Sequence, residues 1–227
     1  MDLSRQKRLV GEDGQKKLAE SHVAVFGIGG VGGYAAEAIA RAGVGTITLV
    51  DSDVVTQSNV NRQIIANRGT IGVPKVDVMA ARIQGINPDC TVYAEQVFID
   101  AENITTLLSG VTYAADAVDT VSAKLAIIEA CSKMGIPAVC AMGAGNKLEG
   151  TFEVTDVFDT KEDALARVMR RELRKRGIEK QKVVCTGAKP LLPLAKDDSM
   201  PSISYMPGLC GLTMAGEIIR DIIGTEQ

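Results

Sequence analysis

The chain has 227 residues, of which 46% are hydrophobic and 23% are charged, and its formal net charge is −3 at pH 7. This composition is typical of a globular protein, and the length suits one α/β domain with a substantial core. The small negative charge gives no overall sign of nucleic-acid binding, and we expect no DNA partner. The first twenty residues are charged throughout, and no apolar run reaches the ~20 residues that span a bilayer. We therefore expect neither a signal peptide nor a membrane partner.

Strand-like and helix-like segments alternate along the first part of the chain. The expected strands lie near 22–27, 46–50, 90–94, 113–118 and 137–141. The expected helices lie near 31–42, 74–86, 101–109 and 122–135. This alternation predicts a Rossmann-like, doubly wound, mainly parallel sheet. Residues 151–157 alternate like a half-exposed strand and predict antiparallel C-terminal additions. We expect one α/β domain over residues 1–227, in two parts, 1–141 and 142–227.

A glycine loop follows the first expected strand, where residues 27–32 form the sequence Gly-Ile-Gly-Gly-Val-Gly. Glycine lets the backbone approach a phosphate closely, and the N-terminus of the next helix favours negative charge. About twenty residues later come Asp51 and Asp53, at a spacing where an acid commonly holds ribose hydroxyls. The loop and the acids together favour a nucleotide ligand.

Polar and cationic residues follow these acids directly. They are Asn59, Arg62, Gln63 and Lys75. Two cations and two amides at this place could hold a third phosphate and offset the charge that develops in phosphoryl chemistry. The alternative is that both cations lie on a solvated surface.

Asp119 comes after the apolar run 114–118, where a further parallel strand should end. Ligands of open α/β sheets bind at the carboxyl ends of the strands, and a carboxylate there could bind Mg²⁺ beside phosphate oxygens. The alternative is that Asp119 caps a helix that begins near Ser122.

In order and spacing, these motifs resemble the ThiF/MoeB/HesA family of ubiquitin-activating-enzyme-like adenylyltransferases. The similar segments are 27–32, 51–53, 59–63, 72–75 and 119–120. The resemblance implies ATP and Mg²⁺ as cofactors, with 1–141 as the ATP-binding half and 142–227 as the substrate and dimer part. It implies ATP contacts by Gly27, Gly29, Gly30, Gly32, Asp51, Asp53, Asn59, Arg62, Gln63, Lys75 and Asp119.

The same resemblance assigns roles to single residues. Asp51 would hold the ribose, the triphosphate would contact Asn59, Arg62 and Lys75, and Asp119 would hold Mg²⁺. The segment 5–9 is similar to the family's N-terminal segment, in which an arginine matching Arg8 reaches the ATP site of the partner subunit. The chain would then act as a homodimer. The implied catalytic residues are Arg8, Arg62, Lys75 and Asp119.

The five cysteines are scattered, and none forms a C-x-x-C pair. A structural zinc site is therefore not expected, although many members of the MoeB and ThiF branches carry two such pairs. Free, buried thiols are typical of a reducing cytoplasm, where we expect the protein to be. No histidine accompanies Cys185, so a nucleophilic role for this thiol is not expected. His22, the only histidine, is expected to be structural.

Residues 163–176 predict an amphipathic helix. One face is apolar, with Leu165, Val168, Met169 and Leu173, and four arginines recur on another face, at Arg167, Arg170, Arg171 and Arg174. A charged face is usually just solvated. This concentration of arginine in an acidic protein nevertheless favours contact with an RNA backbone.

The C-terminal third narrows the resemblance. Segments 143–147, 154–156, 165–167 and 171–174 are similar to one subfamily, the tRNA threonylcarbamoyladenosine dehydratases. This implies an adenylate-forming, ligase-type enzyme that uses ATP to cyclise, and so dehydrate, N6-threonylcarbamoyladenosine in tRNA through an acyl-adenylate. It also implies tRNA as a partner, with sulfur-transfer proteins as further candidates.

Two other functions stay open. The first is an adenylyltransferase for the C-terminal glycine of a ubiquitin-like sulfur-carrier protein, which would share the ATP site and differ in its acceptor. The second is an NAD-binding or non-catalytic Rossmann module, in which the two cations and Asp119 would have no role.

Overall fold

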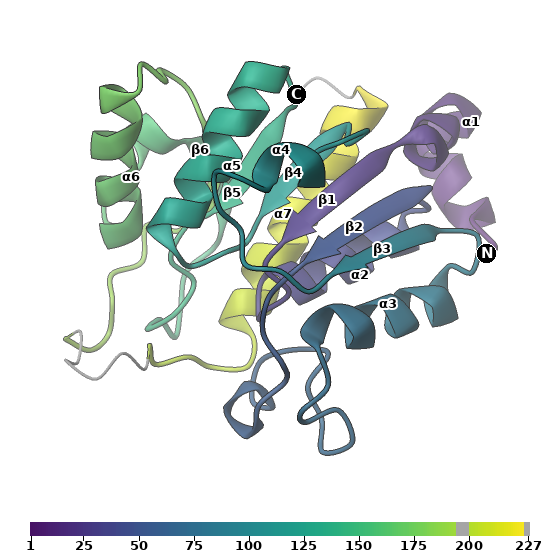
Figure 1. The fold of residues 1–227 in the computed structure, drawn as a ribbon, viewed down its shortest axis with the longest axis horizontal. Coiled ribbons are helices and arrows are strands. Elements are labelled where there is room, and N and C mark those ends of the chain that lie inside the picture. Colours follow the sequence, from purple (N-terminus) through teal and green to yellow (C-terminus); the bar gives the residue numbers. More distant parts are fainter. Residues whose placement is uncertain (194–199, 225–227) are drawn as a thin grey trace.

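The computed structural model describes residues 1–193 and 200–224, in which seven strands form one sheet in the order β3-β2-β1-β4-β5-β7-β6 (Figure 1). The strands are β1 (His22–Phe26), β2 (Thr46–Val50), β3 (Thr91–Glu95), β4 (Tyr113–Asp116), β5 (Ala138–Ala141), β6 (Glu153–Asp156) and β7 (Lys182–Cys185). The helices are α1 (Ser4–Glu20), α2 (Gly32–Arg41), α3 (Lys75–Ile86), α4 (Ile104–Leu107), α5 (Val121–Met134), α6 (Ala164–Lys175) and α7 (Met206–Ile223), with short 3₁₀ turns η1 (Gln57–Asn59) and η2 (Val157–Asp159).

The first six strands in sheet order, β3-β2-β1-β4-β5-β7, pair in parallel with their neighbours. The last strand, β6, pairs antiparallel with β7. The central strand β1 has four fully buried residues, 23–26, as expected where helices cover both faces of a sheet. The prediction of a Rossmann-like, mainly parallel sheet is confirmed. Of the two strands added after residue 142, β6 is antiparallel as expected, whereas β7 extends the parallel part.

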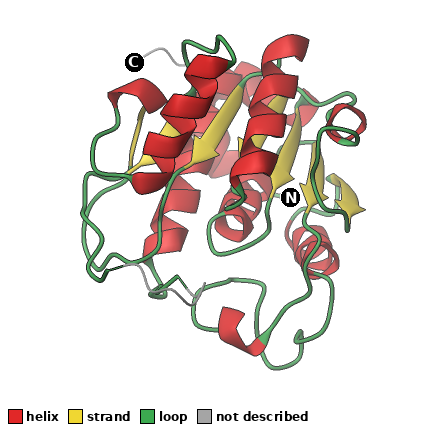
Figure 2. Cartoon of the chain, turned by 60° about the vertical axis from the view of Figure 1, so that its left-hand side comes forward, coloured by secondary structure: helices red, strands yellow, loops and turns green. Residues whose placement is uncertain are grey.

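Helices form a layer on each face of the sheet (Figure 2). On one face α2, α3 and α7 bury Ile39, Met79 and Met214 in one hydrophobic cluster, and α1 packs on α7. On the other face α4 and α5 bury Ile104 and Ile127, and α6 packs on α5 in a third cluster. Within the described residues, no helix is both long enough and apolar enough to cross a membrane.

Two helices differ from the sequence prediction. Helix α1 was not expected, because only Gly14, Gln15 and Leu18 are buried along its length and its apolar pattern is weak. Helix α4 spans 104–107 rather than 101–109. Its expected first turn is instead held by the Asp100 carboxylate, which accepts hydrogen bonds from the backbone amides at 102 and 103 and so competes with helix formation.

The carboxyl ends of the parallel strands meet at one edge of the sheet. The loops that follow β1, β2, β4 and β5 gather there, and segment 51–74 projects farthest from it, at the bottom of Figure 1. Helix α1 lies at the opposite, amino edge, where the backbone carbonyl of Leu18 accepts a hydrogen bond from Gly45, just before β2. Open α/β sheets bind ligands at the carboxyl edge, so the site is sought there.

Candidate active site

The glycine loop lies between the end of β1 and the start of α2. Gly27 has a φ of +84°, and a Cβ there would lie 2.8 Å from the carbonyl oxygen of Ala117. A Cβ on Gly32 would lie 1.8 Å from the carbonyl oxygen of Gly27, so only glycine fits. Helix α2 begins at Gly32 with no side-chain cap, and within its first turn the amide of Gly33 donates to the carbonyl oxygen of Gly29 at 3.0 Å. Such a helix start suits a phosphate group.

Asp51 follows β2 and faces the glycine loop. Its carboxylate accepts hydrogen bonds from the backbone amides of Ile28, at 2.6 Å, and Asp53, at 2.8 Å. The side chain is only 10% exposed, and burial raises the pKa of Asp51, against the opposing effect of the Lys75 ammonium 3.8 Å away. Asp51 therefore joins the loop after β2 to the glycine loop, next to the place where the ribose is expected.

Lys75 is the first residue of α3 and is buried, with 7% of its side chain exposed. Its ammonium donates to the carboxylate of Asp53 at 2.7 Å. The alternative that Lys75 lies on a solvated surface is wrong. Because Asp53 is 64% exposed, a phosphate that enters from solvent could compete with its carboxylate for the Lys75 ammonium.

Asn59 and Arg62 belong to the projecting loop. Asn59 is buried, and its side-chain oxygen accepts a hydrogen bond from the amide of Thr56 at 3.0 Å, which closes the turn η1. Arg62 is held by the carbonyl oxygen of Ser58 at 2.9 Å. Its Cγ lies 3.5 Å from where a Cβ on Gly30 would be, so its side chain borders the glycine loop.

Gln63 provides a direct test of whether a ligand fits here. Its side-chain oxygen is buried and has no hydrogen-bond partner among the described residues. Its side-chain nitrogen lies 3.7 Å from where a Cβ on Gly29 would be. A buried amide oxygen without a partner is costly, and a bound polar ligand would remove that cost. The glycine cradle and this amide together fit a nucleotide.

Asp119 is exposed and lies in the turn between β4 and α5. The N-cap of α5 is Thr120, without a side-chain cap, so the alternative that Asp119 caps this helix is wrong. The Thr120 hydroxyl donates a hydrogen bond to the Asp119 carboxylate at 3.3 Å, and this is the only hydrogen bond of that carboxylate among the described residues. The carboxylate is thus available to a ligand at the carboxyl edge.

A buried ion pair beneath this turn was not found by sequence reasoning. The Lys124 ammonium donates to the Asp116 carboxylate at 3.0 Å, and both side chains are fully buried. Asp116 also accepts from the amide of Val118 at 3.1 Å, and the amide of Lys124 donates to the carbonyl oxygen of Thr120 at 3.0 Å. The pair closes the turn that carries Asp119. An Asp and a Lys eight positions apart give no recognisable signal, because the contact depends on the strand-to-helix turn.

Arg8 does not lie with the other predicted residues. It is exposed on α1, at the amino edge and thus away from the glycine loop (Figure 1). No hydrogen bond or ion pair of its side chain is recorded within the described part of the chain. Within one subunit the structure brings together the glycine loop, Asp51, Asn59, Arg62, Gln63, Lys75 and Asp119, but not Arg8. Its action in a partner subunit stays a prediction.

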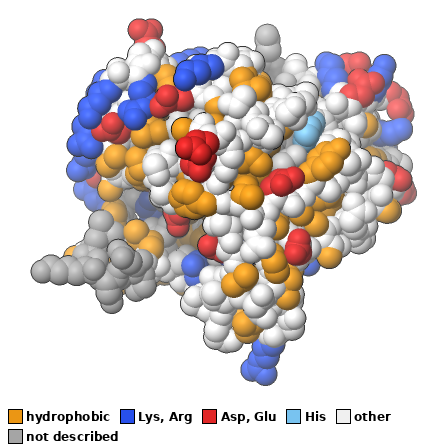
Figure 3. All heavy atoms as spheres, in the orientation of Figure 1, with side chains coloured by type: hydrophobic (Ala, Val, Ile, Leu, Met, Phe, Trp, Pro, Cys, Tyr) orange, Lys and Arg blue, Asp and Glu red, His pale blue; other side chains and the backbone are white. Residues whose placement is uncertain are grey.

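The four arginines of α6 differ in their surroundings. Arg170 is half-buried and donates to the carbonyl oxygen of Thr160 at 2.9 Å, because its position borders the buried stripe of the helix. The other three arginines, Arg167, Arg171 and Arg174, are exposed. In Figure 3, Lys and Arg side chains gather over α6, with acidic side chains among them. Arg171 also pairs with Glu172 at 3.0 Å, and Arg174 lies 5.1 Å from the centroid of the Phe158 ring. The candidate RNA contacts on this helix therefore reduce to three exposed arginines, two of which already have a partner within the chain.

All five cysteines are buried. Burial, together with the nearby acids Glu153 and Asp163, raises the pKa of Cys185 to about 11, which suits an inert thiol. His22 has its ring held by the Gly110 carbonyl and the Thr48 hydroxyl at the amino edge, as expected of a structural residue. Nowhere in 1–193 or 200–224 do three or more His, Cys, Asp or Glu side chains form a group that could hold a metal ion.

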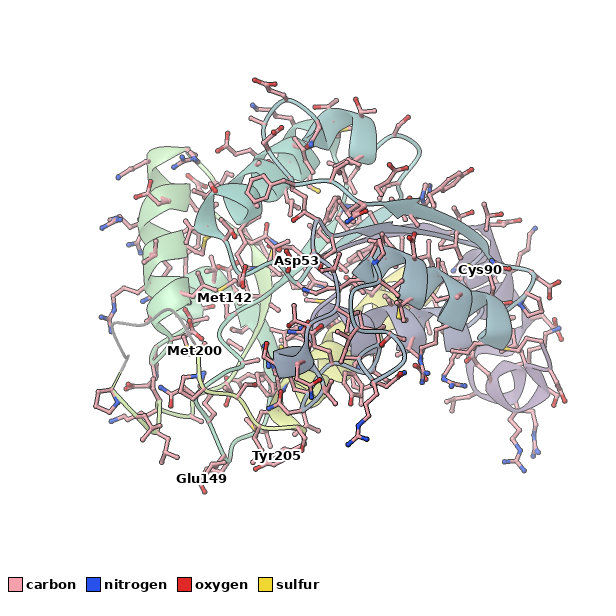
Figure 4. All side chains as sticks on the ribbon, turned by 60° about the horizontal axis from the view of Figure 1, so that its bottom comes forward. Asp53, Cys90, Met142, Glu149, Met200 and Tyr205 are labelled. Carbon is pink, nitrogen blue, oxygen red and sulfur yellow. The ribbon has the colours of Figure 1, made fainter. Side chains whose placement is uncertain are left out.

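Figure 4 turns the carboxyl edge toward the viewer. It labels Asp53, after β2, and Met142, after β5, together with Met200 and Tyr205 from the segment before α7. These labelled residues come from loops that are far apart in sequence.

Comparisons with known proteins agree with this geometry. The ThiF family model matches residues 3–227. The chain is 40% identical to the tRNA threonylcarbamoyladenosine dehydratase of Bacillus subtilis (strain 168), over 97% of this chain and 94% of that protein. Its structure is similar to that of the E. coli enzyme TcdA in complex with ATP, with a TM-score of 0.91, 33% identity, and coverage of 98% of this chain and 93% of that one.

A more distant relative illustrates the rival function. The molybdopterin-synthase adenylyltransferase of Salmonella typhimurium (strain LT2) is 35% identical, over 66% of this chain and 61% of that protein. Its match is therefore partial, whereas the match to the dehydratase of B. subtilis spans nearly both chains.

Proposed function

The chain belongs to the ThiF family, and from that membership and the geometry of the carboxyl edge we propose that it catalyses the ATP-dependent dehydration of N6-threonylcarbamoyladenosine in tRNA. The observation that carries the proposal is the assembly of the glycine cradle, Asp51, Lys75 and Asp119 at one edge of the sheet. It occurs in a chain that matches a named dehydratase over nearly its whole length.

The reaction requires ATP because the threonyl carboxylate of the substrate is a poor acyl donor. Attack of a carboxylate oxygen on the α-phosphorus of ATP forms an acyl-adenylate and releases pyrophosphate. The carbamoyl group of the same side chain then attacks the activated carbonyl carbon, and AMP leaves with the former carboxylate oxygen. The nucleoside loses one water in total. Because the nucleophile and the electrophile are in one molecule, proximity supplies much of the rate.

The residues at the carboxyl edge have distinct tasks in this scheme. The glycine loop and the start of α2 hold phosphate oxygens, while Asp51 lies where the ribose binds. Lys75 and Arg62 offset the charge that develops as pyrophosphate leaves. Arg8, supplied by a second copy of the chain in a homodimer, adds a further cation. No thiol takes part, in agreement with the burial of all five cysteines.

Mg²⁺ belongs to the proposal as well. The ion is usually held by one or two carboxylates together with substrate phosphates, and it supplies charge stabilisation to the departing group. The exposed carboxylate of Asp119 lies at the carboxyl edge and fits this pattern. We place the enzyme in the cytoplasm with tRNA as its partner.

The rival acceptor is a sulfur-carrier protein. Two features argue against a sulfur-carrier acceptor. The sequence has no C-x-x-C pairs, and the three exposed arginines of α6 suit a polyanion better than a small protein tail. An NAD-binding module would leave the buried Lys75 ammonium and Arg62 without a purpose in the cleft.

The decisive experiment uses tRNA that carries threonylcarbamoyladenosine. With ATP and Mg²⁺, the protein should convert that nucleoside to a form lighter by one water, detected by nucleoside mass spectrometry, with one AMP released per conversion. Reactions without ATP, or with unmodified tRNA, are the controls. Adenylation of a Gly-Gly-ended carrier protein while modified tRNA is left unchanged would overturn the proposal in favour of the rival.

A further inference from the structure

Asn146 has an unusual backbone. It is the only non-glycine residue with a positive φ in the described part of the chain, at 57°, and it is 4% exposed. Asparagine tolerates this left-handed conformation better than most residues, but the conformation persists only where the surroundings enforce it. Hydrogen bonds from Asn146 to other parts of the chain hold its backbone in this conformation.

Asn146 makes four hydrogen bonds to a distant part of the chain. Its amide donates to the carbonyl oxygen of Pro201 at 2.6 Å, and its carbonyl oxygen accepts from the amide of Leu191 at 2.8 Å. Its side chain donates to the carbonyl oxygen of Leu192 at 2.7 Å and accepts from the amide of the same residue at 2.9 Å. One residue therefore fastens two stretches of the chain, at 191–192 and at 201.

The segment around Asn146 is also joined to α6. The amide of Gly143 donates to the buried carboxylate of Asp163 at 2.9 Å, and the same carboxylate accepts from Ala166 in the first turn of α6. The buried Lys147 ammonium donates to the carbonyl oxygen of Gly143 at 2.6 Å. The start of the arginine-bearing helix is thus fixed to the segment that contains Asn146.

On its other side, the fastened stretch continues to the projecting loop 51–74 and the glycine loop. The side chain of Asn61 donates to the carbonyl oxygen of Ser202 at 3.1 Å, directly beside Arg62 in sequence. A Cβ on Gly30 would lie 2.9 Å from Pro207, so the start of α7 packs against the glycine loop. Asn146 accordingly stands between the cleft and the proposed RNA-contacting helix.

We propose that Asn146 is a positioning residue for the RNA substrate. By fixing residues 191–192 and 201 between α6 and the glycine loop, it sets the wall along which the modified nucleoside enters and so aligns the threonyl carboxylate with ATP. Asn146 itself contacts neither ATP nor the reacting atoms. This inference rests on the proposed function for the identity of the substrate, while the fastening itself is independent of it.

The test compares two glycine variants. Asn146→Gly keeps the left-handed backbone, which glycine adopts freely, but loses both side-chain hydrogen bonds. Asn103→Gly is the matched control, because its side chain also donates to one backbone carbonyl, that of Phe98, and accepts from one backbone amide, that of Asp100, in the loop that leads into α4.

For Asn146→Gly we expect kcat/KM for the modified tRNA to fall about tenfold, as the loss of two neutral hydrogen bonds predicts, through a raised KM. The affinity for ATP should match that of Asn103→Gly. Equal kcat/KM in the two variants would overturn the proposal. So would an equal fall in ATP–pyrophosphate exchange with a small carboxylate, because Asn146 would then act through the ATP site.

Amide hydrogen exchange separates this inference from the proposed function. The amides of Leu191 and Leu192 should exchange faster in Asn146→Gly than in the wild type and be unchanged in Asn103→Gly. Unchanged exchange in Asn146→Gly would refute the fastening. If exchange rises but wild-type protein leaves modified tRNA intact, the fastening stands and the proposed function fails.

Discussion

The buried pair of Lys124 and Asp116 yields a quantitative prediction. Both side chains are 0% exposed, and 3.0 Å separates the ammonium from the carboxylate. In Lys124→Met a buried carboxylate would lose its only cationic partner among the described residues. Breaking such a pair typically costs about 3–5 kcal/mol of unfolding free energy. In a domain of this size, 1 kcal/mol corresponds to roughly 2–4 °C in Tm, so Tm should fall by about 6–20 °C.

The assay is thermal and urea unfolding at fixed protein concentration. Lys124→Met combined with Asp116→Leu should recover most of the loss, because an apolar pair often replaces a buried ion pair at little cost. Lys175→Met is the matched control. Its ion pair with Glu172, at 2.9 Å, has a lysine that is 61% exposed, and such surface pairs contribute about 0–1 kcal/mol.

Two results would refute this reasoning. If Lys124→Met unfolds within about 1 kcal/mol of the wild type, the carboxylate is neutral or solvated in the native state, and the pair does not hold the β4–α5 turn. If the double variant is as unstable as the single one, the loss comes from packing around position 124 rather than from an uncompensated charge.

The remaining predictions concern activity. Arg62→Ala should abolish carboxylate-dependent ATP–pyrophosphate exchange and leave Tm unchanged; wild-type-like exchange would remove its assigned role. Arg8→Ala mixed with Asp119→Ala should partly regain activity, since one site of each heterodimer has both residues, and proven heterodimers without activity would exclude action in trans. Cys185→Ala should keep full activity, and the native thiol should resist alkylation at pH 8, because a pKa of about 11 leaves only about 0.1% thiolate; rapid labelling or lost turnover would contradict this. Charge reversal at the three exposed arginines of α6 should weaken tRNA binding and flatten its salt dependence, measured by titration at several salt concentrations; unchanged binding would return this face to a solvated surface.

The parallel core could be predicted because its sequence signals are local. Continuous apolar runs give β1, β2 and β4 within about two residues of their observed bounds, since strands buried on both faces contain few polar residues. The glycine loop is equally local, because its steric demands involve the backbone of neighbouring residues. The site residues from Asp51 to Lys75 follow from their order along the chain and from the sheet edge at which parallel strands end.

The unpredicted features depend on contacts that a single sequence does not display. Helix α1 is held by packing on α7, near the other end of the chain, rather than by a strong apolar pattern of its own. The difference between Arg170 and its neighbours arises from Thr160, which η2 places beside the helix. Local periodicity identifies a charged face, but it cannot show which of its members is already bound.

The two polar residues that sequence reasoning missed share one physical property. Lys124 and Asn146 are both buried, and each holds a loop of the carboxyl edge rather than offering its side chain to a ligand. A buried polar group needs its partner to offset desolvation, so the cost of losing that partner fixes the loop in one place. By contrast, the carboxylates of Asp119 and Asp53, which are predicted to contact ATP or its metal ion, are exposed. If the proposed function holds, the alignment of ATP with its acceptor depends in part on these two residues, and substitutions at these positions should alter turnover without removing any of the predicted ATP contacts.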